Sequence, residues 1–160
     1  MRPSQEHKKP KRLESFSYRG YYRYFITIRS HGFKKHFVNN EVVAKLIEIL
    51  KNTAVQESFL IWAYCFMPDH VHLLIEGKNS FADMKKFVAL FKQKTAYWFK
   101  GVCGMQLWDT NYYEHVLRND EATKAVARYI IQNPVRKGLV DDCNSYPYSG
   151  SLELENIASL

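Results

Sequence analysis

The chain has 160 residues and is basic, with 23 Lys and Arg against 16 Asp and Glu and a net charge of +7 at pH 7. Its length and its hydrophobic content of 46% predict one globular domain with a core of its own. The basic excess favours a polyanionic partner, with nucleic acid as the leading candidate, although a solvated basic surface would give the same charge.

The cysteines and the hydropathy exclude several classes of protein. Three widely spaced cysteines, none in a Cys-x-x-Cys pair, argue against a disulfide framework and against a structural zinc site. They favour a reducing compartment, and we expect a cytoplasmic protein. No apolar run approaches the roughly 18 residues of a membrane span, so no membrane partner is expected.

The first part of the chain predicts an arm, a strand, a helix and a second strand. Residues 1–15 are basic and contain two prolines, which predicts a flexible basic arm. Residues 21–29 are rich in aromatic and β-branched residues and form the first expected strand. Asn39 or Asn40 is expected to cap a helix that runs to about residue 51. Residues 58–66 are the second expected strand. The stripe expected to be buried on the helix is Val43, Leu46, Ile47 and Leu50.

Two histidines lie in the third expected strand, residues 70–75, which follows a turn at Pro68. Side chains alternate along a strand, so His70 and His72 project from the same side, with Cα atoms roughly 6.5 Å apart. At that separation two imidazoles can converge on one metal ion. Two strand histidines without any ligand role have the same spacing, so the pattern alone does not decide.

A long helix is expected from a cap at Ser80 to about residue 100, followed by a strand over residues 107–117. Lys85 and Lys92 lie two turns apart on another face of this helix. They indicate either a nucleic-acid groove or an ordinary solvated face. The core stripe expected on the helix is Phe81, Met84, Val88, Phe91 and Trp98.

The last expected helix starts with a cap at Asn119 or Asp120. Tyr129 and Asn133 are four residues apart on it and are therefore neighbours on one face. Pro134 is expected to end or kink the helix around Asn133. The packing stripe expected on this helix is Ala122, Val126, Ala127 and Ile130.

Two segments resemble the HUH tyrosine transposases. Residues 66–74, Phe-Met-Pro-Asp-His-Val-His-Leu-Leu, resemble the family signature, in which two histidines flank a bulky apolar residue. Residues 128–136, Arg-Tyr-Ile-Ile-Gln-Asn-Pro-Val-Arg, resemble the nucleophile helix, a Tyr followed four residues later by Asn or Gln. The resemblance covers roughly residues 22–148 and is closest to the REP-associated tyrosine transposases. Asp69 stands where the family often has Asn, and the loop at residues 30–32 is short.

The order of elements and this resemblance predict an α+β fold, an antiparallel sheet with packed helices in a ferredoxin-like arrangement. The expected division is a flexible basic arm over residues 1–15, a catalytic domain over residues 16–150 and a C-terminal tail over residues 151–160.

The resemblance also implies a chemistry. Tyr129 would be the nucleophile that cleaves and rejoins single-stranded DNA through a 5′-phosphotyrosine. His70, His72 and Asn133 would hold a divalent cation, Mg²⁺ or Mn²⁺. Lys85, Lys92 and Arg136 are the residues expected to bind nucleic acid.

The expected partner is single-stranded DNA that contains a hairpin, and the protein could act as a monomer or a homodimer. The alternative function is a non-catalytic module that binds DNA or RNA hairpins on the same fold. A third interpretation, a basic α+β protein of unrelated role, predicts no dependence on metal at all.

Overall fold

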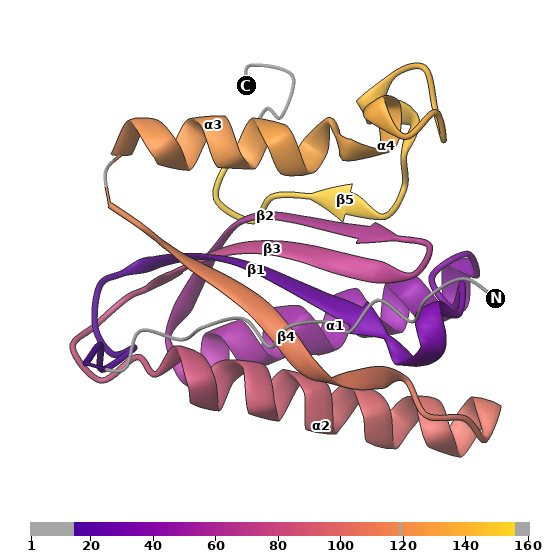
Figure 1. Cartoon of the computed structure of the whole chain (residues 1–160), viewed down its shortest axis with the longest axis horizontal. Helices are drawn as coiled ribbons and strands as arrows, with labels where there is room; N and C mark the ends of the chain where they lie inside the picture. Colours follow the sequence, from indigo (N-terminus) through magenta and orange to yellow (C-terminus); the bar gives the residue numbers. More distant parts are fainter. Residues whose placement is uncertain (1–14, 119, 156–160) are drawn as a thin grey trace, which may run out of the picture.

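The computed structural model describes residues 15–118 and 120–155, which form three layers (Figure 1). A five-stranded antiparallel sheet lies in the middle, with α1 and α2 on one side and α3 and α4 on the other. The elements are β1 (Arg23–Ser30), η1 (His31–Phe33), α1 (Asn40–Glu57), β2 (Phe59–Met67), β3 (His70–Gly77), α2 (Met84–Cys103), β4 (Trp108–Leu117), α3 (Asp120–Ile131), α4 (Asn133–Arg136), η2 (Cys143–Ser145) and β5 (Ser149–Gly150).

The strand order is β4-β1-β3-β2-β5, and all of the pairings are antiparallel. The first four strands, with α1 and α2 as the two crossovers, have the order of a ferredoxin-like fold. The expected α+β architecture is therefore confirmed. The short β5 extends the sheet beyond β2, and the chain reaches it only after α3 and α4 have crossed the free face (Figure 1).

The larger core lies between the sheet and the α1–α2 layer. Alternate residues of β1 and β3, such as Ile26 and Leu73, point into it and are fully buried. Phe87 and Phe91 of α2 meet them from the other side. His70 and His72, which alternate with these buried residues along β3, consequently face the layer of α3 and α4.

A smaller core lies between the sheet and α3. Leu74 of β3 and Cys65 of β2 pack there against Ala127 and Ile130 of α3. The pairing of β2 with β3 shifts register between Ile61 and Ala63, and the alternation of β2 is offset by one residue there. Phe59 and Ile61 therefore face the larger core, whereas Ala63 and Cys65 face the smaller one. The packing stripe expected on α3 is confirmed, with Ala127 and Ile130 buried and Ala122 and Val126 partly buried.

Two helix boundaries differ from those expected. α2 begins at Met84 rather than after Ser80, because the side chain of Asp83 accepts the backbone N–H of Lys86 as its cap. Phe81 consequently lies before the helix and is 87% exposed, so its assignment to the core stripe was wrong. α1 has its cap at Asn39 as expected but continues to Glu57.

Some expectations concern residues outside the described ranges. The basic arm, apart from its last residue, and the cap at Asn119 are among them, and α3 is described from Asp120 onward. The division into arm, domain and tail stays a prediction. Within residues 15–118 and 120–155, no helix combines the length and apolar character needed to span a bilayer.

Candidate active site

The Nε2 atoms of the two histidines of β3 point toward each other. His70 Nε2 and His72 Nε2 are 3.1 Å apart, and the ring centroids are separated by 4.6 Å. The i, i+2 spacing therefore places the rings on one face, as the sequence predicts, and that face is the one toward α3. His72 is 9% exposed.

The Nδ1 atom of each histidine contacts a different side-chain oxygen. His70 Nδ1 lies 2.7 Å from Asp69 Oδ1, and His72 Nδ1 lies 2.8 Å from Thr27 Oγ1. A carboxylate only accepts, so His70 donates from Nδ1, and in the neutral ring the lone pair is then on Nε2. A hydroxyl both donates and accepts, so Thr27 suits either tautomer of His72. These contacts orient both Nε2 atoms toward the same point.

Burial keeps His72 uncharged. The pKa of His72 is lowered to about 3, first by burial and then by its electrostatic interactions with His70 and Arg136. A neutral imidazole has a lone pair available for a metal or a proton, which an imidazolium lacks. The electrostatics therefore suit His72 to act as a ligand rather than as a cation.

Tyr129 lies on α3, across from the histidines. Its ring centroid is 6.4 Å from that of His72 and 6.2 Å from that of Phe25, which itself packs on His72. Tyr129 is 50% exposed, whereas Ile130 next to it is fully buried. Ile130 thus packs the helix against the sheet, and Tyr129 places its phenol at the edge of the site.

Arg136 connects Tyr129 to Asn133. Its guanidinium carbon lies 4.0 Å from the centroid of the Tyr129 ring, and its Nη2 donates to the Tyr129 backbone carbonyl at 2.7 Å. The same nitrogen lies 3.4 Å from Asn133 Oδ1. Asn133 is 2% exposed and begins α4, because Pro134 separates that helix from α3. The expected break at Pro134 is confirmed.

The other two basic residues expected to bind DNA lie on the far side of the sheet. Lys92 Nζ donates to the backbone carbonyls of Asp109 and Thr110 at 2.7 and 3.1 Å. Lys85 Nζ lies 4.8 Å from the centroid of the Tyr18 ring. Both belong to α2, so they are separated from Tyr129 by the sheet (Figure 1). Of the three, Arg136 alone lies beside the histidines and Tyr129.

The donor set fits an octahedral divalent cation. Two ligands at right angles on such an ion, with bonds of about 2.1 Å, are about 3.0 Å apart, close to what the two Nε2 atoms show. No cluster of three or more His, Cys, Asp and Glu side chains suited to a metal occurs in the described part of the chain. A third protein ligand would therefore have to be an amide or hydroxyl oxygen, and Asn133 carries such an atom.

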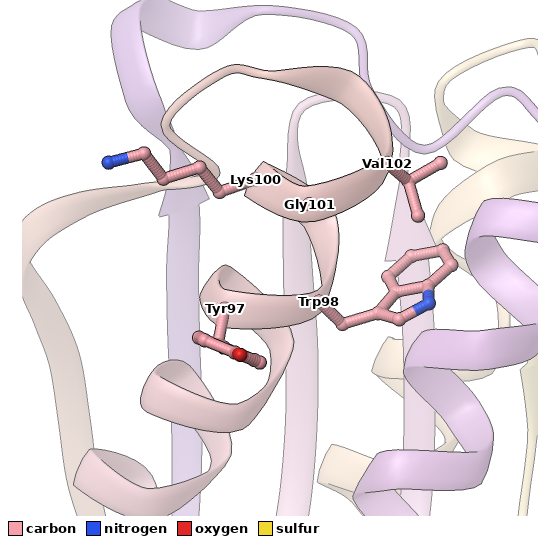
Figure 2. Close-up of a pocket in the computed structure, with 5 residues that line it drawn as sticks. All are labelled: Tyr97, Trp98, Lys100, Gly101 and Val102. Atoms are coloured by element: carbon pink, nitrogen blue, oxygen red, sulfur yellow. The ribbon is translucent and has the colours of Figure 1, made fainter.

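A separate hollow of about 420 Å³ lies at the C-terminal end of α2 (Figure 2). Tyr97, Trp98, Lys100, Gly101 and Val102 line it. It contains no histidine or carboxylate and belongs to the α1–α2 layer, so it is not part of the site on β3.

Sequence reasoning missed Thr27 and the role of Asp69. Asp69 adjoins His70 in sequence, and a carboxylate next to a candidate ligand was a usable signal. Thr27 could have been found only from the register of β1 with β3, which pairs it directly with His72.

The sequence matches a family of DNA-processing enzymes. Residues 19–133 match the family described as "Transposase IS200 like", and the chain belongs to that family.

Two curated relatives and one solved structure are similar to it. The REP-associated tyrosine transposase of Escherichia coli strain K12 is 26% identical over 139 residues, which cover 81% of this chain and 80% of that protein. A Haemophilus influenzae relative is 25% identical over 137 residues, 79% of this chain and 77% of that protein. The fold matches the structure of a REP-associated tyrosine transposase bound to a REP hairpin, with a TM-score of 0.71 and 20% identity over 87% of this chain and 81% of that one.

Proposed function

We propose that this transposase cleaves and rejoins single-stranded DNA, with Tyr129 as the nucleophile and a divalent cation held by His70, His72 and Asn133. The observation that carries the proposal is the 3.1 Å separation of the two histidine Nε2 atoms, opposite a half-exposed tyrosine on α3. A pure binding module has no need for two imidazoles with convergent lone pairs.

Mg²⁺ or Mn²⁺ is the cation that we assign to the site. Such an ion would polarise the scissile phosphate and offset the negative charge that develops during the reaction. Imidazole and amide ligands leave room for phosphate oxygens and water, which these ions favour. The contact of Asn133 Oδ1 with Arg136 is long, at 3.4 Å, so little is lost if the amide turns to another partner.

Tyr129 would carry out the bond-making step. Its phenolic oxygen attacks phosphorus, the new O–P bond replaces the bond to the 3′ oxygen, and the 5′ end stays on the enzyme as a phosphotyrosine. The phenolic proton leaves as the bond forms, and the 3′ oxygen takes up a proton as it departs. A 3′-hydroxyl attacking the same phosphorus reverses the step, so rejoining needs no nucleotide cofactor.

We further propose that the DNA contains a hairpin. The support is the solved structure of similar fold, which is a transposase bound to a REP hairpin. The basic charge of this chain suits a folded strand with many closely spaced phosphates.

Incubation of the protein with hairpin oligonucleotides and Mn²⁺ tests the proposal. A protein–DNA species that survives denaturing gel electrophoresis and disappears when Mn²⁺ is chelated is the expected result. Hairpin binding without any such species, over a series of hairpins with different single-stranded flanks, would instead favour the non-catalytic binding module.

A further inference from the structure

A basic residue that the proposed chemistry does not use lies directly beside the histidines. Arg29 on β1 is the cross-strand partner of His70. Directly opposite residues in an antiparallel pair project from the same face, with Cβ atoms about 4.5–5.5 Å apart. Arg29 therefore lies on the face that carries His70 and His72, and its side chain is exposed to solvent.

The guanidinium of Arg29 lies against an exposed aromatic ring. Its Cζ atom is 5.3 Å from the centroid of Phe33, which is 46% exposed. Phe33 has a φ of +55° and follows Gly32 with a φ of +63°. A left-handed backbone is unusual for a bulky residue, and such conformations cluster at ligand-binding sites.

The loop that holds Phe33 is fixed to the turn that begins the histidine strand. Ser30 N–H donates to the Asp69 carbonyl at 2.9 Å, and Phe37 N–H donates to the Pro68 carbonyl at 3.0 Å. The position of the ring relative to His70 is therefore set by backbone hydrogen bonds on both sides of the loop.

The surroundings of Arg29 are mainly cationic. Lys34 and Lys35 follow Phe33 and are both exposed. Two carboxylates of the neighbouring segments already have partners, since Asp69 contacts His70 Nδ1 and Asp109 lies 3.6 Å from His31 Nδ1. An anion approaching Arg29 would thus meet a surface whose negative groups are engaged elsewhere.

We infer that Arg29 and Phe33 form a binding site for one nucleotide of single-stranded DNA, next to the phosphate that Tyr129 attacks. Arg29 takes the phosphate of that nucleotide, because a guanidinium presents a planar fork of donors. Phe33 stacks on its base, a contact that every base can make. The inference rests on the proposed function only for which phosphate is attacked, because the binding itself requires no chemistry.

Equilibrium binding of a fluorescein-labelled hairpin with a single-stranded flank tests the site. The protein carries Tyr129→Phe in every case, so that binding is measured without an adduct. Phe33→Ala is expected to weaken binding roughly 5- to 150-fold, and Phe33→Tyr to retain it, since tyrosine also stacks. Phe81→Ala is the matched control, because Phe81 is 87% exposed and lies elsewhere.

The salt dependence tests the phosphate contact. Arg29→Ala should make the slope of log K against log salt shallower by about 0.7, the value for one phosphate of a single strand. Arg29→Lys should keep the slope. Lys51→Ala removes one exposed charge from α1, on the other side of the sheet, and should leave the slope unchanged.

A scan of abasic positions along the flank locates the base. At one position, an abasic nucleotide should weaken binding to the protein in which Phe33 is intact. With that oligonucleotide, Phe33→Ala should have no further effect, because both changes delete the same contact. A Phe33→Ala effect no larger than that of Phe81→Ala, or additive with every abasic position, overturns the inference.

The inference and the proposed function can fail separately. If the protein with Tyr129 intact forms no adduct but Phe33→Ala and Arg29→Ala behave as expected, the nucleotide site stands and the cleavage proposal falls. If the adduct forms and neither substitution differs from its control, the cleavage proposal stands and the nucleotide site is wrong.

Discussion

At the scale of single residues, the proposed chemistry depends on which tyrosine can reach the phosphate. Tyr112 and Tyr113 of β4 are the tyrosines to compare with Tyr129. Tyr112 packs against the core under α1 and α2, on the other face from the histidines. Tyr113 is 48% exposed and pairs with Thr27, so it lies on the histidine face and is the serious competitor. Tyr129 differs in that it shares a basic partner, Arg136, with the amide of Asn133.

Tyr129→Phe is therefore expected to abolish the covalent DNA adduct while folding and hairpin binding survive. The substitution removes one oxygen, and a group that makes the new bond itself cannot be replaced by positioning alone. Gel electrophoresis of the denatured adduct is the measurement, with Tyr113→Phe as the matched control. An adduct that persists in Tyr129→Phe and disappears in Tyr113→Phe would reassign the nucleophile.

Asp69 and Thr27 give a second prediction at this scale. Asp69→Ala is expected to weaken Mn²⁺ binding about 10- to 100-fold, because the carboxylate fixes the orientation and tautomer of His70. Asp69→Asn keeps an accepting oxygen and should retain most of the affinity. Thr27→Val should act in the same direction on His72.

Electron paramagnetic resonance of free Mn²⁺ in titrations without DNA measures this affinity directly. Glu48→Ala serves as the control for the loss of one carboxylate, since Glu48 is exposed on α1. Unchanged Mn²⁺ affinity in both Asp69→Ala and Thr27→Val would remove these residues from the metal site.

At the scale of elements, α3 has two roles, and adjacent residues of the helix serve them. It closes the smaller core with Ala127 and Ile130, and it carries Tyr129 toward the histidines. It packs on the sheet through the side chains of the smaller core, so its position depends on them. The break at Pro134 then sets Asn133 at the start of α4, where Arg136 contacts it.

Ile130→Ala is expected to lower the free energy of unfolding by about 2–5 kcal/mol, the range for removing a large aliphatic side chain from a core. Ile130 is fully buried, whereas Val55 on α1 is 83% exposed. Val55→Ala should accordingly stay within about 0.5 kcal/mol of the parent protein. Urea titration followed by circular dichroism measures both. A loss for Ile130→Ala as small as that for Val55→Ala would show that α3 is not anchored through the smaller core.

At the scale of the whole molecule, the sheet separates two groups of basic residues. Arg136 and Arg29 lie on the side of the histidines, and Lys85 and Lys92 lie on the side of α2. Lys92 is held by backbone carbonyls of β4, so part of its charge is used within the fold. A DNA hairpin that contacts both groups would have to pass around an edge of the sheet.

Lys85→Ala and Arg136→Ala are therefore expected to act differently. Both should weaken hairpin binding and make its salt dependence shallower, since each removes a charge that attracts phosphates. At saturating DNA, Arg136→Ala should also slow adduct formation, because Arg136 contacts the Tyr129 ring and carbonyl. Single-turnover rates at saturating hairpin, with Mn²⁺ present, separate the two effects. Equal slowing by Lys85→Ala would mean that the α2 side contributes to the reacting geometry.

The sequence by itself determined the elements and the faces on which their residues lie. Side-chain alternation alone placed His70 and His72 on one side of a strand. Helical spacing predicted that Tyr129 and Asn133 share one helix face, whereas they lie on α3 and α4 and are linked through Arg136. The sequence also placed β4 correctly from its aromatic residues and predicted the end of α3 at Pro134. It misjudged the start of α2, because Ser80 and Asp83 are both good caps and only the folded chain shows which is used.

Only the tertiary structure decided how these faces meet. The repeat of side chains along a strand or helix fixes which residues share a face. The crossovers of the chain decide which layer covers that face, and they place α2, with Lys85 and Lys92, on the side of the sheet away from Tyr129. Strand register, which depends on contacts far apart in sequence, made Thr27 the partner of His72 and Arg29 the neighbour of His70. The 3.1 Å approach of the two Nε2 atoms accompanies a contact at each Nδ1, with Thr27 for His72 and with Asp69 for His70, and such contacts fix the orientation of an imidazole ring.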